Sequence, residues 1–328
     1  MTPVTASVTT GANQQFTAMV SGSPNTTVTR TLSGTGCSGT GCGTIDSTGL
    51  YTAPATVPSS ASVTITASSQ SDPIKSASAV VSIVPHQAAG YSLAWEDTFS
   101  TLSLCTTSVA GCNWYDPGLW YAGPTGKITD PSSNYVNLQW ANGQSNNSTS
   151  MSTASGNLLD YRAWTYGYFE VSMSFNPVTG NWPGLWLMSV ADGPGNATDG
   201  LPYAELDIFE WQSQEPTIFN GAIHVWEDGS FLSGEYVTPT PTGITYSNFN
   251  SYGVLWTPTS ITWYLNNVSM GTVSTAEAPF NKVFNGEQPL FLILSEQAGC
   301  NWVSTCAGQL SPLDMKVQWV HVYQLPAN

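Results

Sequence analysis

The sequence has few charged residues, and basic residues are the scarcest. Only 8% of its 328 residues are charged, and six Lys and Arg against 21 Asp and Glu give a formal net charge of −15. Such a chain lacks the basic surface that nucleic acid phosphates require. The same charge repels sulfated or uronic-acid polymers, so a neutral or cationic partner is favoured.

Long apolar runs and an export signal are also missing from the sequence. No stretch approaches the roughly 20 apolar residues of a membrane-spanning helix, so no membrane partner is expected. The first ten residues, MTPVTASVTT, have neither a basic start nor an apolar centre, so no signal peptide is visible. Abundant Ser, Thr, Gly, Asn and aromatic residues are typical of secreted β-proteins. We therefore expect a secreted, extracellular or cell-surface protein in a form that has lost its signal.

Cysteine is scarce, and its few residues fall in close pairs. Even numbers at short spacings predict small disulfide loops formed in an oxidising compartment, with reduced thiols as the alternative. No CxxC or paired-His pattern accompanies them, so metal binding by these thiols is not expected. Such short loops would stiffen the chain locally more than they stabilise it globally. The expected pairs are Cys37 with Cys42, Cys105 with Cys112, and Cys300 with Cys306.

The organisation along the chain predicts two β-domains. Residues 1–86 read as short alternating segments separated by turn clusters such as SGSPN and SGTGCSGTGCG, which indicates a small β-sandwich. Residues 87–92 are the expected linker. Residues 93–328 continue as aromatic-rich strands, without a long amphipathic helix, and predict a larger antiparallel β-sandwich.

The first segment resembles the bacterial immunoglobulin-like domains. The resemblance rests on GANQQFTAMVSG, GCGTIDSTGLYTAP and the closing SASAVVSIV. It implies a spacer or adhesive module with no chemistry of its own.

The heptapeptide ELDIFEW carries Glu205, Asp207 and Glu210 on one apolar stretch. In a strand, residues two apart share a face, so the first two acids point the same way. Strict alternation would send Glu210 into the core, where a lone carboxylate is costly. One inserted residue, a β-bulge at Ile208 or Phe209, returns Glu210 to the acidic face, and bulges are frequent beside active sites.

Carboxyl groups gathered in this way suit one reaction in particular. Mutual repulsion and desolvation raise the pKa of at least one of them. Hydrolysis of a glycosidic bond with retention needs an ionised nucleophile and a protonated acid about 5–5.5 Å apart. A solvated acidic face and a calcium site are the alternatives. The neighbouring Trp residues favour catalysis.

The segment ELDIFE resembles the E-x-D-x-x-E signature of glycoside hydrolase family 16, whose fold is a curved β-jelly roll. Landmarks in family order surround it: YGYFEVSMSF and GNWPGLWLM before it, then GAIHVW, FNSYGVLWTPTSITWYLNN, PLFLILSEQAG and MKVQWVHVYQ. The resemblance covers residues 93–324 and is closer to the laminarinase and agarase branches than to the lichenase branch. It implies that Glu205 is the nucleophile, Asp207 its helper and Glu210 the acid/base.

A polysaccharide groove pairs aromatic platforms with neutral hydrogen-bonding groups. In GAIHVW, period two places His224 and Trp226 on the face of the acids, while Trp211 should face the core and Gln212 should return to the groove. The segment SEQAGCNWVSTC departs from the laminarinase pattern, and its cysteine loop presents Trp302 as a groove wall. The groove residues that we expect are Trp182, Trp186, Gln212, His224, Trp226 and Trp302.

The resemblance also bears on metals. Many family members bind a structural calcium through an Asp near the C-terminal strand, where this chain has Gln318, a weaker ligand. Glu96 and Asp97 could contribute to such a site. We expect no catalytic metal or cofactor.

The leading hypothesis is therefore a monomeric, secreted, endo-acting β-glucan hydrolase that works with retention on β-1,3 or mixed β-1,3/1,4 linkages. A hydrolase or transglycosylase acting on galactan, agarose or xyloglucan is the nearest alternative. A lectin-like module without catalysis and a purely structural surface protein are alternatives of other classes.

Overall fold

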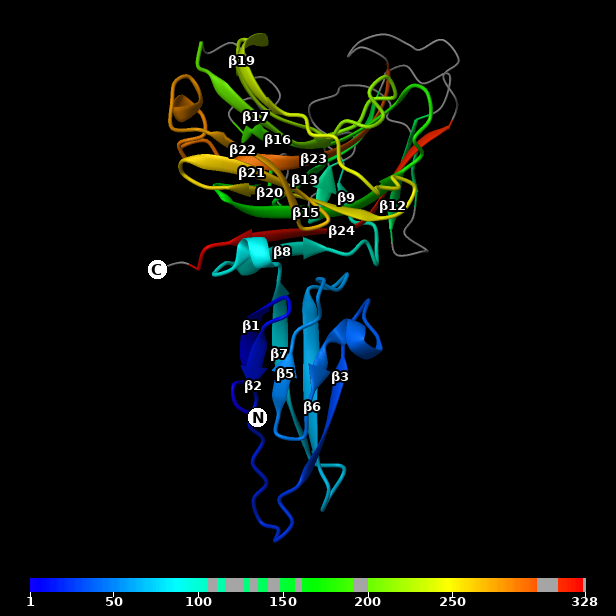
Figure 1. Ribbon diagram of the computed structural model, residues 1–328, viewed down its shortest axis with the longest axis vertical. Coiled ribbons are helices and arrows are strands. Elements are labelled where there is room, and N and C mark those ends of the chain that lie inside the picture. Colours follow the sequence, from blue (N-terminus) through cyan, green and yellow to red (C-terminus); the bar gives the residue numbers. More distant parts are fainter. Residues whose placement is uncertain are drawn as a thin grey trace. The chain divides into compact units, whose positions relative to one another are not determined.

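The computed structural model describes residues 1–105, 111–115, 127–129, 135–140, 148–156, 161–190, 200–299 and 312–326. Over these ranges the chain is built from β-strands and contains no α-helix, which confirms the all-β prediction (Figure 1). Short 3₁₀ turns lie at Gly39–Cys42, His86–Ala88 and Phe280–Lys282. None of the helical segments described is long and apolar enough to cross a membrane.

The chain divides into two compact units. One comprises Met1–Thr98 together with His321–Asn328, and the other comprises Phe99–Val320. The linker that we expected, residues 87–92, lies a little before this division. The domain boundaries inferred from the sequence therefore stay a prediction.

The first unit holds a four-stranded and a three-stranded sheet in its described residues. The four-stranded sheet consists, in order, of β1 (Thr5–Thr9), β7 (Ser76–Val84), β6 (Ser62–Ser69) and β3 (Val28–Ser33). The three-stranded sheet consists of β2 (Asn13–Gln15), β5 (Leu50–Thr52) and β4 (Thr44–Ile45). Strand β6 alternates between buried and half-buried residues, as a strand with one face in a core should. Its Val63 and Ile65 pack with Phe16 and Tyr51, and the core thus joins both sheets.

The second unit is a sandwich of two large sheets. Among the described residues, the larger sheet has nine strands and carries the site discussed below. Its strands are, in order, β19 (Ser230–Val237), β18 (Asn220–Glu227), β17 (Tyr203–Glu210), β16 (Asn181–Ser189), β23 (Leu290–Ala298), β13 (Ser148–Thr153), β10 (Trp114–Tyr115) and β9 (Leu104–Cys105), with β14 (Ala163–Trp164) paired to β23.

The other sheet has eight strands over the same described ranges. Seven of its strands are, in order, β11 (Lys127–Thr129), β12 (Val136–Trp140), β24 (Leu313–Gln324), β15 (Gly167–Phe175), β20 (Asn250–Trp256), β21 (Ser260–Leu265) and β22 (Val268–Ser274). The eighth, β8 (Ser92–Asp97), falls within the residues of the first unit and pairs with β24.

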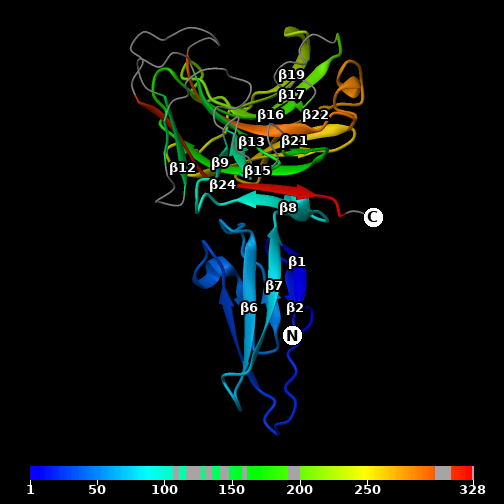
Figure 2. The same ribbon diagram turned by 180° about the vertical axis from the view of Figure 1, so that it is seen from behind.

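The two sheets of the second unit lie over one another as curved layers (Figures 1 and 2). Aromatic side chains fill the space between them: the ring of Phe209 on β17 lies 4.4 Å from that of Tyr252 on β20. The rings of Phe175 on β15 and Trp211, just past β17, lie 5.2 Å apart. This architecture confirms the predicted jelly-roll sandwich.

Two of the expected disulfides are present. Cys37 is bonded to Cys42, and Cys105 to Cys112, which confirms these predictions. Cys300 and Cys306 lie outside the described residues.

Candidate active site

The acidic strand β17 contains the predicted bulge. On the side of β18, Asp207 pairs with Ala222 and Glu210 pairs with Asn220, so three steps along β17 match two along β18. On the side of β16, the pairing skips Ile208. Ile208 is therefore the extra residue, and the alternation of the strand changes phase there.

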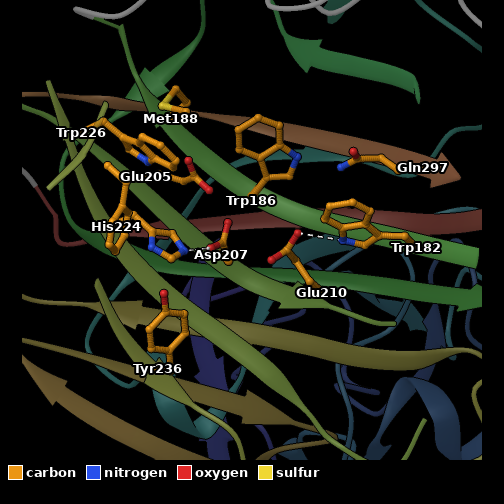
Figure 3. Close-up of a pocket in the computed structure, with 11 residues that line it drawn as sticks. Trp182, Trp186, Met188, Glu205, Asp207, Glu210, His224, Trp226, Tyr236 and Gln297 are labelled. Carbon is orange, nitrogen blue, oxygen red and sulfur yellow. Dashed lines mark hydrogen bonds and ion pairs between the residues drawn. The ribbon is translucent and has the colours of Figure 1, made fainter. Parts of the chain in front are cut away.

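The change of phase brings the three acids to one face. Glu205, Asp207 and Glu210 all line one pocket of about 720 Å³ on the nine-stranded sheet (Figure 3). Ile208 and Phe209, between the second and third acids, are fully buried in the sandwich. Glu205 and Glu210 are half-buried, whereas Asp207 is only 2% exposed. We name this cavity the acidic pocket.

Neighbouring strands supply a polar partner for two of the acids. Nε2 of His224, on β18, lies 3.0 Å from Oδ2 of Asp207. The indole N–H of Trp182, on β16, donates a hydrogen bond of 3.0 Å to Oε1 of Glu210. Both contacts are drawn as dashed lines in Figure 3, where the acids stand side by side. Asp207 and Glu210 are thus held by groups from opposite sides of β17.

The electrostatics of the pocket favour protonated carboxyl groups. Burial raises the pKa of Glu205 well above its usual range, Asp207 adds to the rise, and His224 and Trp226 offset part of it. Burial also raises the pKa of Asp207 to about 7, although its hydrogen bond with Glu205 opposes the rise. Since these two carboxyl groups are hydrogen-bonded and both hold protons more tightly than usual, they can share a proton.

Glu210 is the third acid, and it sits at the other side of Asp207 in Figure 3. Burial raises the pKa of Glu210 to about 8, and the nearby Asp207 carboxyl adds to the rise. The Trp182 hydrogen bond and His224 act in the opposite direction. A carboxyl group with this pKa holds its proton at neutral pH and can give it to a substrate.

Several of the expected groove residues also line the acidic pocket. They are Trp182, Trp186, His224 and Trp226. The indole N–H of Trp186 donates to Oγ of Ser295 on β23, at 3.1 Å, which fixes the ring against the sheet.

One expected groove residue, Gln212, does not line the pocket. Gln212 is 5% exposed and is not among the pocket-lining residues, so this prediction is wrong. Strand β17 ends at Glu210, and the alternation that placed Gln212 on the groove face no longer applies beyond that end. Trp302 lies outside the described residues.

The sequence reasoning missed four lining residues: Met188, Phe231, Tyr236 and Gln297. A signal for two of them was available. Asp228 and Gly229 form a tight turn with positive φ angles of 48° and 75°, and an Asp-Gly pair between two apolar runs predicts a hairpin. Following that hairpin, Tyr236 comes opposite Ala222, which itself pairs with Asp207.

Metal binding can be tested against the side chains present. Ligand atoms of Glu205, Asp207 and His224 lie within 4.8 Å of one another, close enough to share an ion. The calcium ligands implied by the resemblance, Glu96, Asp97 and Gln318, fit less well.

Two of these calcium candidates already have protein partners. Oε2 of Glu96 lies 3.6 Å from Nε2 of His321. Oε1 of Gln318 accepts a hydrogen bond of 3.2 Å from the Ser172 hydroxyl. A calcium ion bound by these two side chains would compete with those contacts.

Curated relatives align with about half of this chain. An endo-1,3-1,4-beta-glycanase, EglC, of Rhizobium meliloti is 31% identical over 179 residues, which is 53% of this chain and 34% of that protein. A keratan-sulfate endo-1,4-beta-galactosidase of Sphingobacterium multivorum is 28% identical over 165 residues, or 49% of this chain and 37% of that one. The chain thus spans little more than a third of the length of these relatives.

Solved structures share the fold over most of the chain. The laminarinase catalytic domain of Thermotoga maritima superposes with a TM-score of 0.55 at 18% identity, over 73% of this chain and 99% of that one. The endo-beta-1,3-glucanase of Pyrococcus furiosus gives a TM-score of 0.52 at 16% identity, over 73% and 96% of the two chains.

The family is shown by a match to a family model. A family model described as glycosyl hydrolases family 16 matches residues 126–321, more than half of the sequence. This range includes the bulged acidic strand and the strands on both sides of it. The chain therefore belongs to glycosyl hydrolases family 16.

Proposed function

We propose that the protein is an endo-acting β-glucan hydrolase that cleaves β-1,3 or mixed β-1,3/1,4 linkages with retention of configuration. The observation that carries the proposal is the one-residue bulge, which gathers three carboxyl groups on the floor of an aromatic-lined pocket. Membership of the family supports it, as do the names of the endo-1,3-1,4-beta-glycanase relatives.

In the first step Glu205 acts as the nucleophile. Its carboxylate oxygen forms a bond to the anomeric carbon while the glycosidic bond breaks and Glu210 gives its proton to the leaving oxygen. Attack requires Glu205 to be ionised. Asp207, whose pKa is raised to about 7, then holds the proton that these two carboxyl groups share. His224, at 3.0 Å from Asp207, orients this helper.

In the second step water releases the sugar. The Glu210 carboxylate accepts a proton from the water, whose oxygen attacks the anomeric carbon as the bond to Glu205 breaks. Glu210 thereby regains the proton that it gave, and the raised pKa of about 8 favours its return. Each step inverts the configuration of the anomeric carbon, so the two steps together retain it.

The walls of the pocket suit a neutral sugar chain. Trp186, Trp226 and Phe231 offer flat apolar surfaces, and Gln297 offers a neutral hydrogen-bonding group. No Lys or Arg is among the lining residues that the structure describes, and the whole chain carries a net charge of −15. Such a groove does not repel an uncharged polymer, and an uncharged polymer brings no charge that would need a basic partner there.

A polysaccharide panel tests the proposal. The wild-type protein should release reducing ends from β-1,3-glucan or mixed-linkage glucan, and proton NMR should detect the β anomer as the first product. Glu205→Gln should keep its fold by circular dichroism and lose turnover. Undiminished hydrolysis by Glu205→Gln would refute the assigned nucleophile, and an α-configured first product would refute retention.

A second substrate class is favoured by one comparison. The keratan-sulfate endo-1,4-beta-galactosidase relative suggests a galactan, although the acidic chain disfavours a sulfated one. Hydrolysis of unsulfated galactan, agarose or xyloglucan in place of glucan would move the assignment to that polymer. Longer products than substrates would indicate transfer to sugar, and binding without cleavage would indicate a lectin-like module.

We further propose that residues 1–86 form an immunoglobulin-like spacer and that the protein is secreted and monomeric. The two sheets packed on one core support the sandwich of the first unit. The Cys37–Cys42 and Cys105–Cys112 disulfides support an oxidising compartment. Light scattering of the purified protein tests the oligomeric state, and a dimer would contradict it.

A further inference from the structure

A tryptophan of the second sheet reaches the acidic strand from behind. Trp263 lies on β21, in the eight-stranded sheet, and is fully buried. Its indole N–H donates a hydrogen bond of 2.7 Å to the backbone carbonyl of Asp207, in the nine-stranded sheet. The bond therefore crosses the sandwich and ends at the middle acid of the pocket.

The accepting carbonyl stands where the strand ladder is broken. The regular pairing of β17 with β18 stops at Asp207 and resumes at Glu210. Buried carbonyl groups need a donor, and a bulge removes the regular ones. The Trp263 indole supplies a donor at the residue where the bulge begins, so it can fix the direction in which the chain leaves Asp207.

A glycine on the neighbouring strand makes room for the indole. Gly221 on β18 precedes Ala222, the partner of Asp207. A Cβ atom at Gly221 would lie 2.5 Å from both Cδ1 and Nε1 of Trp263, which is closer than real contacts allow. The residue opposite Trp263 on β22 is also a glycine, Gly271. The position of the Trp263 ring therefore depends on the absence of a side chain at Gly221.

We propose that Trp263 is a positioning residue: its hydrogen bond to the Asp207 carbonyl holds the bulge that aims Glu210 at the same sugar as Glu205. The inference rests on the proposed function and adds a residue that does not touch the substrate. Nothing in the pocket lining reveals it, because Trp263 lies beneath the floor.

The decisive variant is Trp263→Phe, with Trp256→Phe as its matched control. Both indoles are fully buried and belong to the eight-stranded sheet. Nε1 of Trp256, however, makes no hydrogen bond within the described part of the chain, and its ring packs on Tyr166 and Phe284. The control removes the same atoms without releasing a backbone carbonyl.

We expect Trp263→Phe to lower kcat on glucan by about 10- to 100-fold with a KM within about twofold of wild type, because a small misplacement of the acid slows the chemical step. Trp256→Phe should keep kcat within about twofold when assayed well below the melting temperature of each variant. An equal loss in both variants would overturn the proposal, as would an unchanged kcat in Trp263→Phe.

Three further variants guard against a simple folding defect. Benzothienylalanine at position 263 keeps the ring shape but lacks the N–H, and it should reproduce the loss of kcat. Gly221→Ala should displace the indole and lower kcat by a similar factor. The double variant Gly221→Ala with Trp263→Phe should then be no slower than Trp263→Phe alone, whereas multiplied losses would show that the two residues act independently.

A titration that needs no turnover separates this inference from the proposed function. Carbon-13 NMR of labelled glutamate carboxyl groups should show Glu210 titrating near its raised pKa of about 8 in wild type. In Trp263→Phe the released strand should admit water and move this pKa toward the ordinary glutamate value. If the wild type cleaves no polysaccharide, the proposed function fails; an unmoved Glu210 titration in Trp263→Phe overturns the positioning role in either case.

Discussion

At the residue scale, burial and the hydrogen bond from Trp182 act in opposite directions on the pKa of Glu210. Burial raises the pKa of Glu210 to about 8, while the indole N–H of Trp182 favours the ionised carboxylate and so lowers it. The balance keeps the group protonated at neutral pH and still able to release its proton in the reaction.

The variant Trp182→Phe should move the alkaline limb of the kcat/KM profile to higher pH. Removing the donor withdraws support from the ionised form, so the pKa of Glu210 rises further and the acid stays protonated to a higher pH. Initial rates on soluble glucan between about pH 5 and 10 measure the limb. A limb that moves to lower pH would contradict the assignment of Glu210 as the acid.

The variant Glu205→Gln should be more stable than wild type, and its advantage should grow with pH. The pKa of Glu205 is raised in the folded protein, so the folded state binds this proton more tightly than the unfolded state. That contribution is full below the ordinary pKa and is lost as pH rises toward the raised one. Melting temperatures measured from pH 4 to pH 9 test the trend, and Gln214→Glu is a surface control for the change of charge.

Single residues also show how far the sequence alone could go. Glu205, Asp207 and Glu210 were predicted to share a face because a buried lone carboxylate is too costly, and one bulge was the least change that avoided it. Gln212 was misplaced because the same alternation was extended past the end of β17. Between Glu210 and Pro216 the sequence has no Gly or Pro that would mark the end of β17.

At the scale of elements, β17 works because its alternation changes phase once. The segment before Ile208 presents Glu205 and Asp207 to the pocket, and the segment after it presents Glu210. Strand β17 therefore acts as two short strands that share an axis and differ by one residue in phase.

Deleting Ile208 should leave an all-β protein that still hydrolyses glucan. Without the extra residue, Asp207, Phe209 and Glu210 follow regular alternation, so both acids still face the pocket and Phe209 still faces the interior. Loss of the buried Ile208 side chain lowers stability and the shorter strand changes the aim of Glu210, so we expect a lower melting temperature and turnover reduced by about tenfold. Reducing-end assays and far-ultraviolet circular dichroism measure both effects, with Ile208→Val as the control that keeps the bulge. A complete loss of turnover in a folded deletion variant would contradict this account of the bulge.

The hairpin of β18 and β19 is the element that the sequence analysis left out. Its Asp-Gly turn was readable, and its pairing would have placed Tyr236 beside the acids. The large sheet as a whole was harder to predict, because β16 and β23 are buried at nearly every position and show no alternation to read. Long-range pairings such as β13 with β23 are set by tertiary packing.

At the scale of the whole molecule, the net charge of −15 acts on every encounter with substrate. A neutral glucan does not feel this field, whereas an anionic polymer is repelled over a distance set by the ionic strength. Selection among polysaccharides thus begins before any contact in the pocket.

Carboxymethylated β-glucan should accordingly be a poor substrate at low salt and a better one at high salt. Raising sodium chloride from about 10 mM to about 0.3 M shortens the screening length and should raise kcat/KM for the carboxymethylated polymer several-fold. The value for the uncharged glucan should stay constant over the same range. A parallel response of the two polymers would show that the net charge does not influence encounter.

The bulge at Ile208 has a consequence for the history of such genes. Loss of its codon would leave the three carboxyl groups at alternate positions of a regular strand, still on one side of the sheet. A shorter motif with the same acids is therefore a single mutational step away, and the strands on either side need no change of register. Two spacings of one set of acids can thus arise within a single fold.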